Sequence, residues 1–348
     1  MIQNMSKENI KDYTLEELKK VMSDLNEPAY RAGQIFDWLY DNDAKDFDVM
    51  TNLSKDLRAE LSERYYIFRS DIIDEKNMRD STKYLITLED NNLIETVLLR
   101  YKYGYTLCVS SQVGCKMGCG FCASTVNGFI RNLKPGEMLE QILTVERQNK
   151  VRVSRIVIMG SGEPLDNYEN VMRFIRIIND KHGLNIGARH ITISTCGIVP
   201  GIYKLSEENL QLTLAISLHA VTDDKRRSIM PVNKVYPIKD IISAVKYFVE
   251  RTNRRVTFEY TMIEGFNDTE KDASELALLT KGILCNVNLI PVNIVKEKGF
   301  LPSSPNTIAK FKNKLEEYGV NVTVRRSLGE DIDAACGQLR SSYMKNQE

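Results

Sequence analysis

The sequence predicts an α/β protein in which parallel β-strands alternate with helices. From about residue 104 onward, short runs rich in Val, Ile, Leu and Thr alternate with amphipathic segments that have helical spacing. Such alternation favours parallel strands joined by right-handed helical crossovers. The pattern is compatible both with an open barrel and with a doubly wound sheet.

The first 65 residues predict a small helical domain, which could contact RNA if the protein binds one. Residues Thr14-Leu15-Glu16-Glu17 form a capping-box pattern, in which the Thr and Glu side chains satisfy the first amides of a helix. Apolar residues follow at helical spacing: Leu18, Val21, Met22 and Leu25.

Residues 66–103 predict a β-hairpin that links this domain to the rest of the chain. Two strand-like runs, 83–88 and 93–100, flank the turn residues Asp90-Asn91-Asn92.

Residues 104–295 predict the core of six strands and their helices. The expected strands are 105–109, 155–159, 190–194, 212–217, 256–261 and 286–290, and the expected helices are 135–148, 168–179, 238–251 and 270–281. The segment from Pro302 to Pro305 reads as a linker. Residues 296–348 then form a carboxy-terminal extension that carries Cys336.

Composition indicates a folded protein without a membrane segment. Hydrophobic residues make up 43% of the 348 residues and charged residues 27%, which is ordinary for a globular protein. No stretch approaches the roughly 20 apolar residues that span a bilayer, and the amino terminus lacks a secretory signal pattern. We therefore expect a cytoplasmic protein and, by default, a monomer.

The charge distribution says little about partners. Basic and acidic residues are equal at 47 each, so the net charge is zero. The first 100 residues carry 14 basic and 21 acidic side chains, which leaves an excess of seven positive charges in the remainder. A polyanion would therefore meet the later part of the chain, although solvated surfaces alone can produce such an asymmetry.

Three of the seven cysteines form the strongest chemical signal. Cys115, Cys119 and Cys122 have the spacing C-x3-C-x2-C directly after the first strand of the core. Three thiolates on a glycine-containing loop can bind three irons of a 4Fe-4S cluster and leave the fourth iron open. Zinc is the competing interpretation, but a structural zinc site needs four ligands, and no adjacent fourth Cys or His is present.

This arrangement resembles the radical S-adenosylmethionine (SAM) superfamily. The resemblance implies a partial (βα)6 TIM-like barrel in which SAM binds the open iron and its reductive cleavage yields a 5′-deoxyadenosyl radical. At the end of the second core strand, the run Gly160-Ser-Gly-Glu-Pro164 resembles the loop with which that superfamily contacts the methionine amino group.

A narrower resemblance, to the RlmN/Cfr family of adenosine methyltransferases, covers nearly the whole chain. It is carried by five segments: Cys108–Cys115, Asn127–Asn132, Ser217–His219, Met230–Asn233 and Gly329–Leu339. By motif position, the resemblance implies SAM contacts at Gly162, Glu163, Ser194, Ser217, Leu218, His219 and Asn293.

The family resemblance also implies the catalytic residues. Cys336 takes a methyl group from one SAM molecule, and a second SAM supplies the radical that activates this methyl group, so each turnover uses two. Cys108 releases the product by forming a disulfide with Cys336. Glu95 removes the ring proton of adenine. An electron donor such as flavodoxin or ferredoxin is implied as a partner, and Cys196 and Cys285 are assigned to packing.

The expected substrate is 23S rRNA, methylated at C2 of adenine 2503, with adenine 37 of tRNA as a second target. The nearest alternative is methylation of C8 of the same rRNA adenosine, as in the antibiotic-resistance branch of the family, but Pro164 favours the C2 branch. A noncatalytic iron–sulfur or zinc module that binds RNA is the alternative from a different class.

Overall fold

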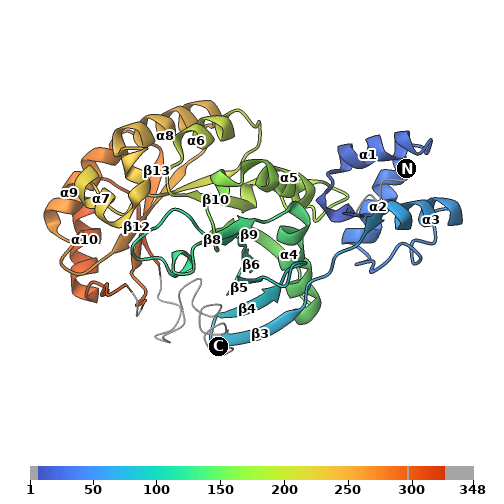
Figure 1. Ribbon diagram of the computed structural model, residues 1–348. Helices are drawn as coiled ribbons and strands as arrows, with labels where there is room; N and C mark the ends of the chain where they lie inside the picture. Colours follow the sequence, from blue (N-terminus) through green and yellow to red (C-terminus); the bar gives the residue numbers. More distant parts are fainter. Residues whose placement is uncertain (1–6, 296–297, 326–348) are drawn as a thin grey trace.

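The computed structural model describes residues 7–295 and 298–325 of the chain, and Figure 1 shows their arrangement. A ten-stranded sheet dominates the fold, with the strand order β14-β13-β12-β11-β10-β9-β6-β5-β4-β3. No helix within these described residues is long and apolar enough to cross a membrane.

Six consecutive parallel strands form the centre of this sheet, and each overlaps one of the predicted strands. They are β6 (Gly104–Cys108), β9 (Val153–Ile158), β10 (Ile191–Thr195), β11 (Thr213–Ser217), β12 (Val256–Met262) and β13 (Cys285–Pro291). Their spatial order follows their sequence order, whereas a doubly wound sheet would reverse order at a switch point. The sheet is open, because its outermost strands β3 and β14 do not pair. These facts confirm the prediction of a partial six-unit barrel.

Helices lie along the outside of the curved sheet (Figure 1). Those of the barrel are α4 (Pro135–Asn149), α5 (Tyr168–Asn179), α6 (Val199–Ser206), α7 (Asp223–Ile229), α8 (Ile238–Thr252), α9 (Glu270–Thr280) and α10 (Pro305–Glu317). The sequence predicted α4, α5, α8 and α9. It missed the short α6 and α7, and Pro305, expected to end a linker, is instead the first residue of α10, where its fixed φ is favourable.

The two faces of the parallel strands differ in polarity. Outward side chains such as Ile156, Ile193 and Ile216 are fully buried against the helices. Inward side chains are mostly polar, and many of them are only half-buried: Thr192, Ser194, Thr213, Ser217, Thr257, Asn286 and Asn288. The inner face of the barrel is therefore a polar, partly accessible surface.

An antiparallel extension continues the sheet beyond β6. The predicted hairpin corresponds to β4 (Ser81–Thr87) and β5 (Leu93–Tyr101). A third strand, β3 (Ile72–Met78), was not predicted, because charged residues interrupt its apolar pattern. At the opposite edge, the short β14 (Val322–Val324) pairs with β13.

The amino-terminal residues form helices, as the sequence predicts. They are α1 (Leu15–Asp24), α2 (Tyr30–Tyr40) and α3 (Lys55–Arg64), with a small parallel pair formed by β1 (Glu8–Asn9) and β2 (Tyr65–Tyr66). The capping box at Thr14 is present. A fully buried ion pair, Lys11 Nζ to Glu140 Oε1 at 2.5 Å, attaches this part of the chain to α4. Short 3₁₀ helices occupy Ile10–Asp12, Ala123–Thr125, Pro164–Asp166, Ala188–His190 and Pro231–Lys234.

Candidate active site

Most of the predicted site residues lie at the carboxyl ends of the parallel strands. The cysteine loop follows β6, Gly162 and Glu163 follow β9, and Ser217 ends β11. Ser194 lies near the end of β10, and Asn293 is an exposed residue two positions after β13. The carboxyl ends of parallel strands share one edge of the sheet, which is where α/β barrels build their active sites.

The cysteine loop is closed by a small antiparallel pair, β7 (Gln112–Gly114) and β8 (Phe129–Asn132). Gly114 has φ of 75°, and a Cβ atom there would lie 1.8 Å from the carbonyl oxygen of Gly128. That carbonyl accepts a hydrogen bond from the amide of Cys115. Only glycine permits this close approach, which fixes the start of the loop.

Two of the three thiols, those of Cys115 and Cys119, are buried enough to disfavour their charged form. Burial raises the pKa of Cys115 to about 12 and also raises the pKa of Cys119, and the neighbouring thiols add to both shifts. Within the described residues, no three Cys, His, Asp or Glu side chains gather closely enough for one metal ion. A set of three cysteines suits a cluster, in which each cysteine binds a different iron, better than a structural zinc site, which needs four ligands.

The loop that contains Glu163 packs tightly against the segment before the cysteines. Cβ atoms added at Gly160 and Gly162 would lie 2.6 Å from atoms of Ser110 and Gln112, respectively. The carboxylate of Glu163 accepts hydrogen bonds from the amides of Cys196 (2.7 Å) and Leu165 (3.0 Å). Burial raises the pKa of Glu163. This carboxylate therefore joins the end of β9 to the end of β10.

Gln112 holds the same loops together, a role that the sequence did not reveal. Its side-chain oxygen accepts from the Glu163 amide at 2.9 Å, and its amide nitrogen donates to Asn132 (2.8 Å) and Asp166 (2.9 Å). The side chain thereby connects the cysteine-loop hairpin with the loop after β9.

His219 is buried as a neutral imidazole beside the cysteine loop. Its Nδ1 accepts a hydrogen bond from the Thr261 amide at 3.0 Å, which places the ring proton on Nε2. Burial and the charge of Arg226 lower its pKa to about 3. Its ring meets Phe121 edge to face, with the centroids 4.8 Å apart. Leu218, the preceding residue, is fully buried.

A second residue missed by the sequence analysis, Arg226 of α7, is fully buried beneath these strand ends. Its guanidinium donates to the carbonyl oxygens of Leu218 (3.1 Å), Ser217 (3.1 Å) and Cys196 (2.6 Å). A charged residue in a short amphipathic helix normally indicates a solvent-exposed position, so its burial could not be anticipated.

Glu95 and Cys108 come together through the pairing of β5 with β6. Val97 is opposite Cys108, and the Thr96 hydroxyl donates to the Cys108 carbonyl at 2.6 Å. Glu95, with its β5 neighbours Leu93 and Ile94, lines a small pocket. The other lining residues come from both ends of the cysteine loop and from the loop after β9: Gly114, Ala123, Ser124, Asn127 and Ser161. The structure thus places the predicted base beside the predicted cluster loop.

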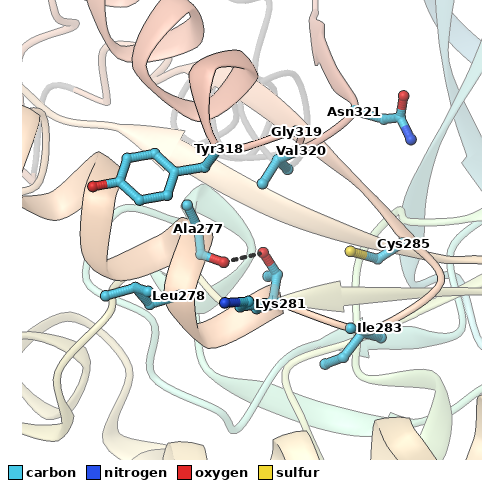
Figure 2. A pocket seen from close by; sticks show the side chains of 11 residues that line it. Ala277, Leu278, Lys281, Ile283, Cys285, Tyr318, Gly319, Val320 and Asn321 are labelled. Carbon is cyan, nitrogen blue, oxygen red and sulfur yellow. Dashed lines mark hydrogen bonds between the residues drawn. The ribbon is translucent and has the colours of Figure 1, made fainter.

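The remaining cysteines have different surroundings. Cys196 packs with Ile229 and Met230 in an apolar cluster that also contacts Cys119. Cys285 is buried at the start of β13. It lines a pocket at the amino-terminal edge of the sheet, away from the predicted site residues, formed with the end of α9 and with Tyr318 to Asn321 (Figure 2). Cys336 lies outside the described residues.

Comparison with known proteins places the chain in a family. Residues 8–67 match the ribosomal RNA large subunit methyltransferase N-terminal domain, and residues 109–277 match the radical SAM superfamily. A protein of Clostridium perfringens strain 13, described as a probable dual-specificity RNA methyltransferase RlmN, is 53% identical over 97% of this chain and 98% of its own length. The chain belongs to the RlmN family.

Other relatives of the RlmN family agree with this assignment. The corresponding protein of Clostridium botulinum strain Eklund 17B is 54% identical over 98% of both chains. A crystal structure of a radical SAM methyltransferase from Sphaerobacter thermophilus, 44% identical, covers 95% of this chain and 98% of its own with a TM-score of 0.89. The chain is therefore a radical SAM RNA methyltransferase whose cofactors are a 4Fe-4S cluster and SAM, which excludes the noncatalytic alternative.

Proposed function

We propose that this enzyme methylates C2 of adenine 2503 in 23S rRNA and, as a second substrate, adenine 37 of tRNA. The names of the curated relatives support an RNA substrate with dual specificity. The observation that carries the proposal is the pocket in which Glu95 meets the cysteine loop and the loop after β9. It offers a base next to the position where SAM and the cluster would bind.

In this proposal Cys115, Cys119 and Cys122 bind the cluster. SAM contacts come from Gly162, Glu163, Ser194, Ser217, Leu218, His219 and Asn293. The polar inner face of the barrel supports this assignment, because Ser194 and Ser217 lie half-buried on that same face. His219 would present its Nε2 proton as a hydrogen-bond donor, since Nδ1 already accepts from Thr261.

The bound cluster and SAM supply a 5′-deoxyadenosyl radical. Cys336 accepts a methyl group from a first SAM molecule, since a thiolate is a good nucleophile for polar displacement. With a second SAM molecule bound, the S-methyl group of Cys336 would lose a hydrogen atom to the radical, and its carbon would then bond to the adenine ring. Glu95 would then take the ring proton, and the odd electron of the adduct would return to the cluster. Cys108 would attack the sulfur of Cys336, so that a disulfide forms as the carbon–sulfur bond breaks, and the released carbon would take up a proton to complete the methyl group.

The RNA must present an unstacked adenine, because a ring carbon inside a helical stack is inaccessible. The partly accessible inner face of the barrel has the polar groups that such a base needs. A flavodoxin or ferredoxin would deliver the electron, and a monomer would suffice, since the proposed site uses residues of one chain.

Nucleoside analysis tests the proposed position. Reconstituted enzyme would be incubated anaerobically with protein-free 23S rRNA, dithionite and methyl-labelled SAM, followed by mass spectrometry of the digested RNA. We expect label in 2-methyladenosine with the wild type and none with Cys336→Ala. Label in 8-methyladenosine would show the alternative regiochemistry, and no label from enzyme with an intact cluster would refute the rRNA substrate.

A further inference from the structure

Arg226 is a fully buried cation, and its hydrogen bonds to the described residues all go to neutral groups. Besides the carbonyl oxygens of Leu218, Ser217 and Cys196, its guanidinium donates to the side-chain oxygen of Asn233 at 2.9 Å. Among the residues that the structure describes, no carboxylate forms an ion pair with it. The nearby Asp223 attracts Arg226 without bonding to it, and its own hydrogen bonds come from Asn233 and from the amide of Ile238.

A buried charge without a directly bonded ion-pair partner is costly, even when its hydrogen bonds are satisfied. An apolar side chain of similar volume could fill this space at lower cost, but it could not bind three carbonyl groups. The cation therefore suggests that an anionic group belongs nearby in the working enzyme.

The surroundings of Arg226 indicate where that anion lies. The carbonyl of Ile229, in the same helix, accepts from the Gly120 amide of the cysteine loop at 2.7 Å. Cys119, Cys196 and Ile229 belong to one apolar cluster. Helix α7, which carries this guanidinium, thus packs against the cysteine loop, while Arg226 itself holds the ends of β10 and β11.

We propose that Arg226 is a positioning residue that compensates the negative charge of the thiolate-bound cluster and aligns the two strand ends that bind SAM. This inference rests on the proposed assignment of Cys115, Cys119 and Cys122 as cluster ligands. A positive charge near the cluster favours its reduced form, because reduction adds a negative charge. Removing that charge should lower the reduction potential.

The test compares the reduction potential of the reconstituted cluster in wild type, Arg226→Gln and Arg226→Lys. It would be measured by anaerobic redox titration without RNA, together with SAM binding by equilibrium dialysis. We expect Arg226→Gln to have a more negative potential and to bind SAM about tenfold more weakly. Arg226→Lys should keep the wild-type potential, because it keeps the positive charge. It loses only the forked hydrogen bonds of the guanidinium.

Arg254→Gln is the matched control. Arg254 also donates to the backbone of this sheet, at the Leu212 carbonyl, but before β11 begins rather than after it ends. Its substitution should change neither the potential nor SAM binding.

Three outcomes would count against the inference. A folded Arg226→Gln variant with the wild-type potential and SAM affinity would overturn it and leave the proposed function intact. If Arg226→Gln fails to fold, a lowered potential in Arg226→Lys would overturn it as well. A wild-type protein that binds no iron would refute the cluster assignment itself, and the inference with it.

Discussion

The hydroxyl of Thr96 donates a hydrogen bond to the backbone carbonyl of Cys108 at 2.6 Å. This hydrogen bond adds to the backbone pairing of β5 with β6, next to the proposed active site. Ser110 reinforces the connection, since its hydroxyl donates to the carbonyl of Glu95 at 2.6 Å. The proposed base and the proposed product-releasing thiol are therefore held in one rigid antiparallel pair.

Replacing Cys108 should stop the reaction after the new carbon–carbon bond has formed. In Cys108→Ala no thiol can attack the sulfur of Cys336, so the RNA stays attached to the protein. Denaturing gels should show a slowly migrating band that ribonuclease removes. Cys285→Ala, a substitution of a buried thiol at the opposite edge of the sheet, should give no such band. A Cys108→Ala enzyme that releases methylated RNA would contradict the role assigned to Cys108.

Lys83 and Glu95 form a buried ion pair, with 3.6 Å between Nζ and Oε2 and side-chain exposures of 0% and 4%. Lys83→Met would leave the Glu95 carboxylate buried without this opposite charge, and we expect it to lower the free energy of unfolding by about 3 kcal/mol. Urea unfolding of Lys83→Met, of Glu95→Gln and of the double variant measures the coupling free energy between the two side chains.

The exposed ion pair Arg64–Glu60, with 2.6 Å between Nη2 and Oε1, is the comparison, and the same set of single and double substitutions would be made there. Its coupling should stay below about 1 kcal/mol. Additive effects of the Lys83 and Glu95 substitutions would show that the buried pair contributes nothing to the fold.

His219 should make the enzyme sensitive to acid. Its pKa is about 3 in the folded state, below the ordinary 6.5 of the unfolded chain. The contribution of neutral His219 to the free energy of unfolding is therefore fully present above about pH 6.5. It falls as the pH drops toward 3, because in this range only the unfolded state takes up the proton. Lowering the pH from 7 to 5 should therefore reduce the free energy of unfolding by about 2 kcal/mol through this group alone.

His219→Asn should lose this part of the pH dependence. Asparagine tolerates the positive φ of 57° at this position and offers an oxygen where Nδ1 accepts from Thr261. Denaturant unfolding at both pH values checks the difference, with His190→Asn, a substitution of an exposed histidine, as the control. Equal pH dependence in wild type and His219→Asn would contradict the assignment.

Gly162→Ala should abolish SAM binding. The residue has φ of 108°, and an added Cβ would lie 2.6 Å from the Cβ of Gln112 and 2.8 Å from its backbone nitrogen. The loop after β9 would have to move, and the amide and carboxylate of Glu163 would move with it. Gly265→Ala, with φ of 66° but open space around it, separates the effect of backbone strain from that of the clash. Similar SAM affinities in the two variants would rule out the steric explanation.

The sequence predicted the elements whose signal is local. The six core strands have continuous apolar or alternating runs, and the capping box at Thr14 indicates the start of α1. The glycine-rich segments around the cysteines and before Glu163 were also recognisable, because close backbone packing demands glycine at Gly114, Gly160 and Gly162.

Relationships between distant residues could not be read in this way. The pairing of Lys83 with Glu95 depends on the register of β4 and β5, and the burial of Arg226 depends on how α7 packs under β10 and β11. Strand β14 has only three residues, too few for a periodic pattern. Such features arise from tertiary packing rather than from local propensity.

The most direct test of the proposed mechanism follows the hydrogen atoms of the transferred methyl group. Enzyme and RNA would react anaerobically with SAM that carries a fully deuterated methyl group, and the mass of the methyladenosine product would be measured. A route through Cys336 and hydrogen abstraction predicts a methyl group that has lost one of its three deuterium atoms. A product that retains all three would show direct methyl transfer and contradict the mechanism.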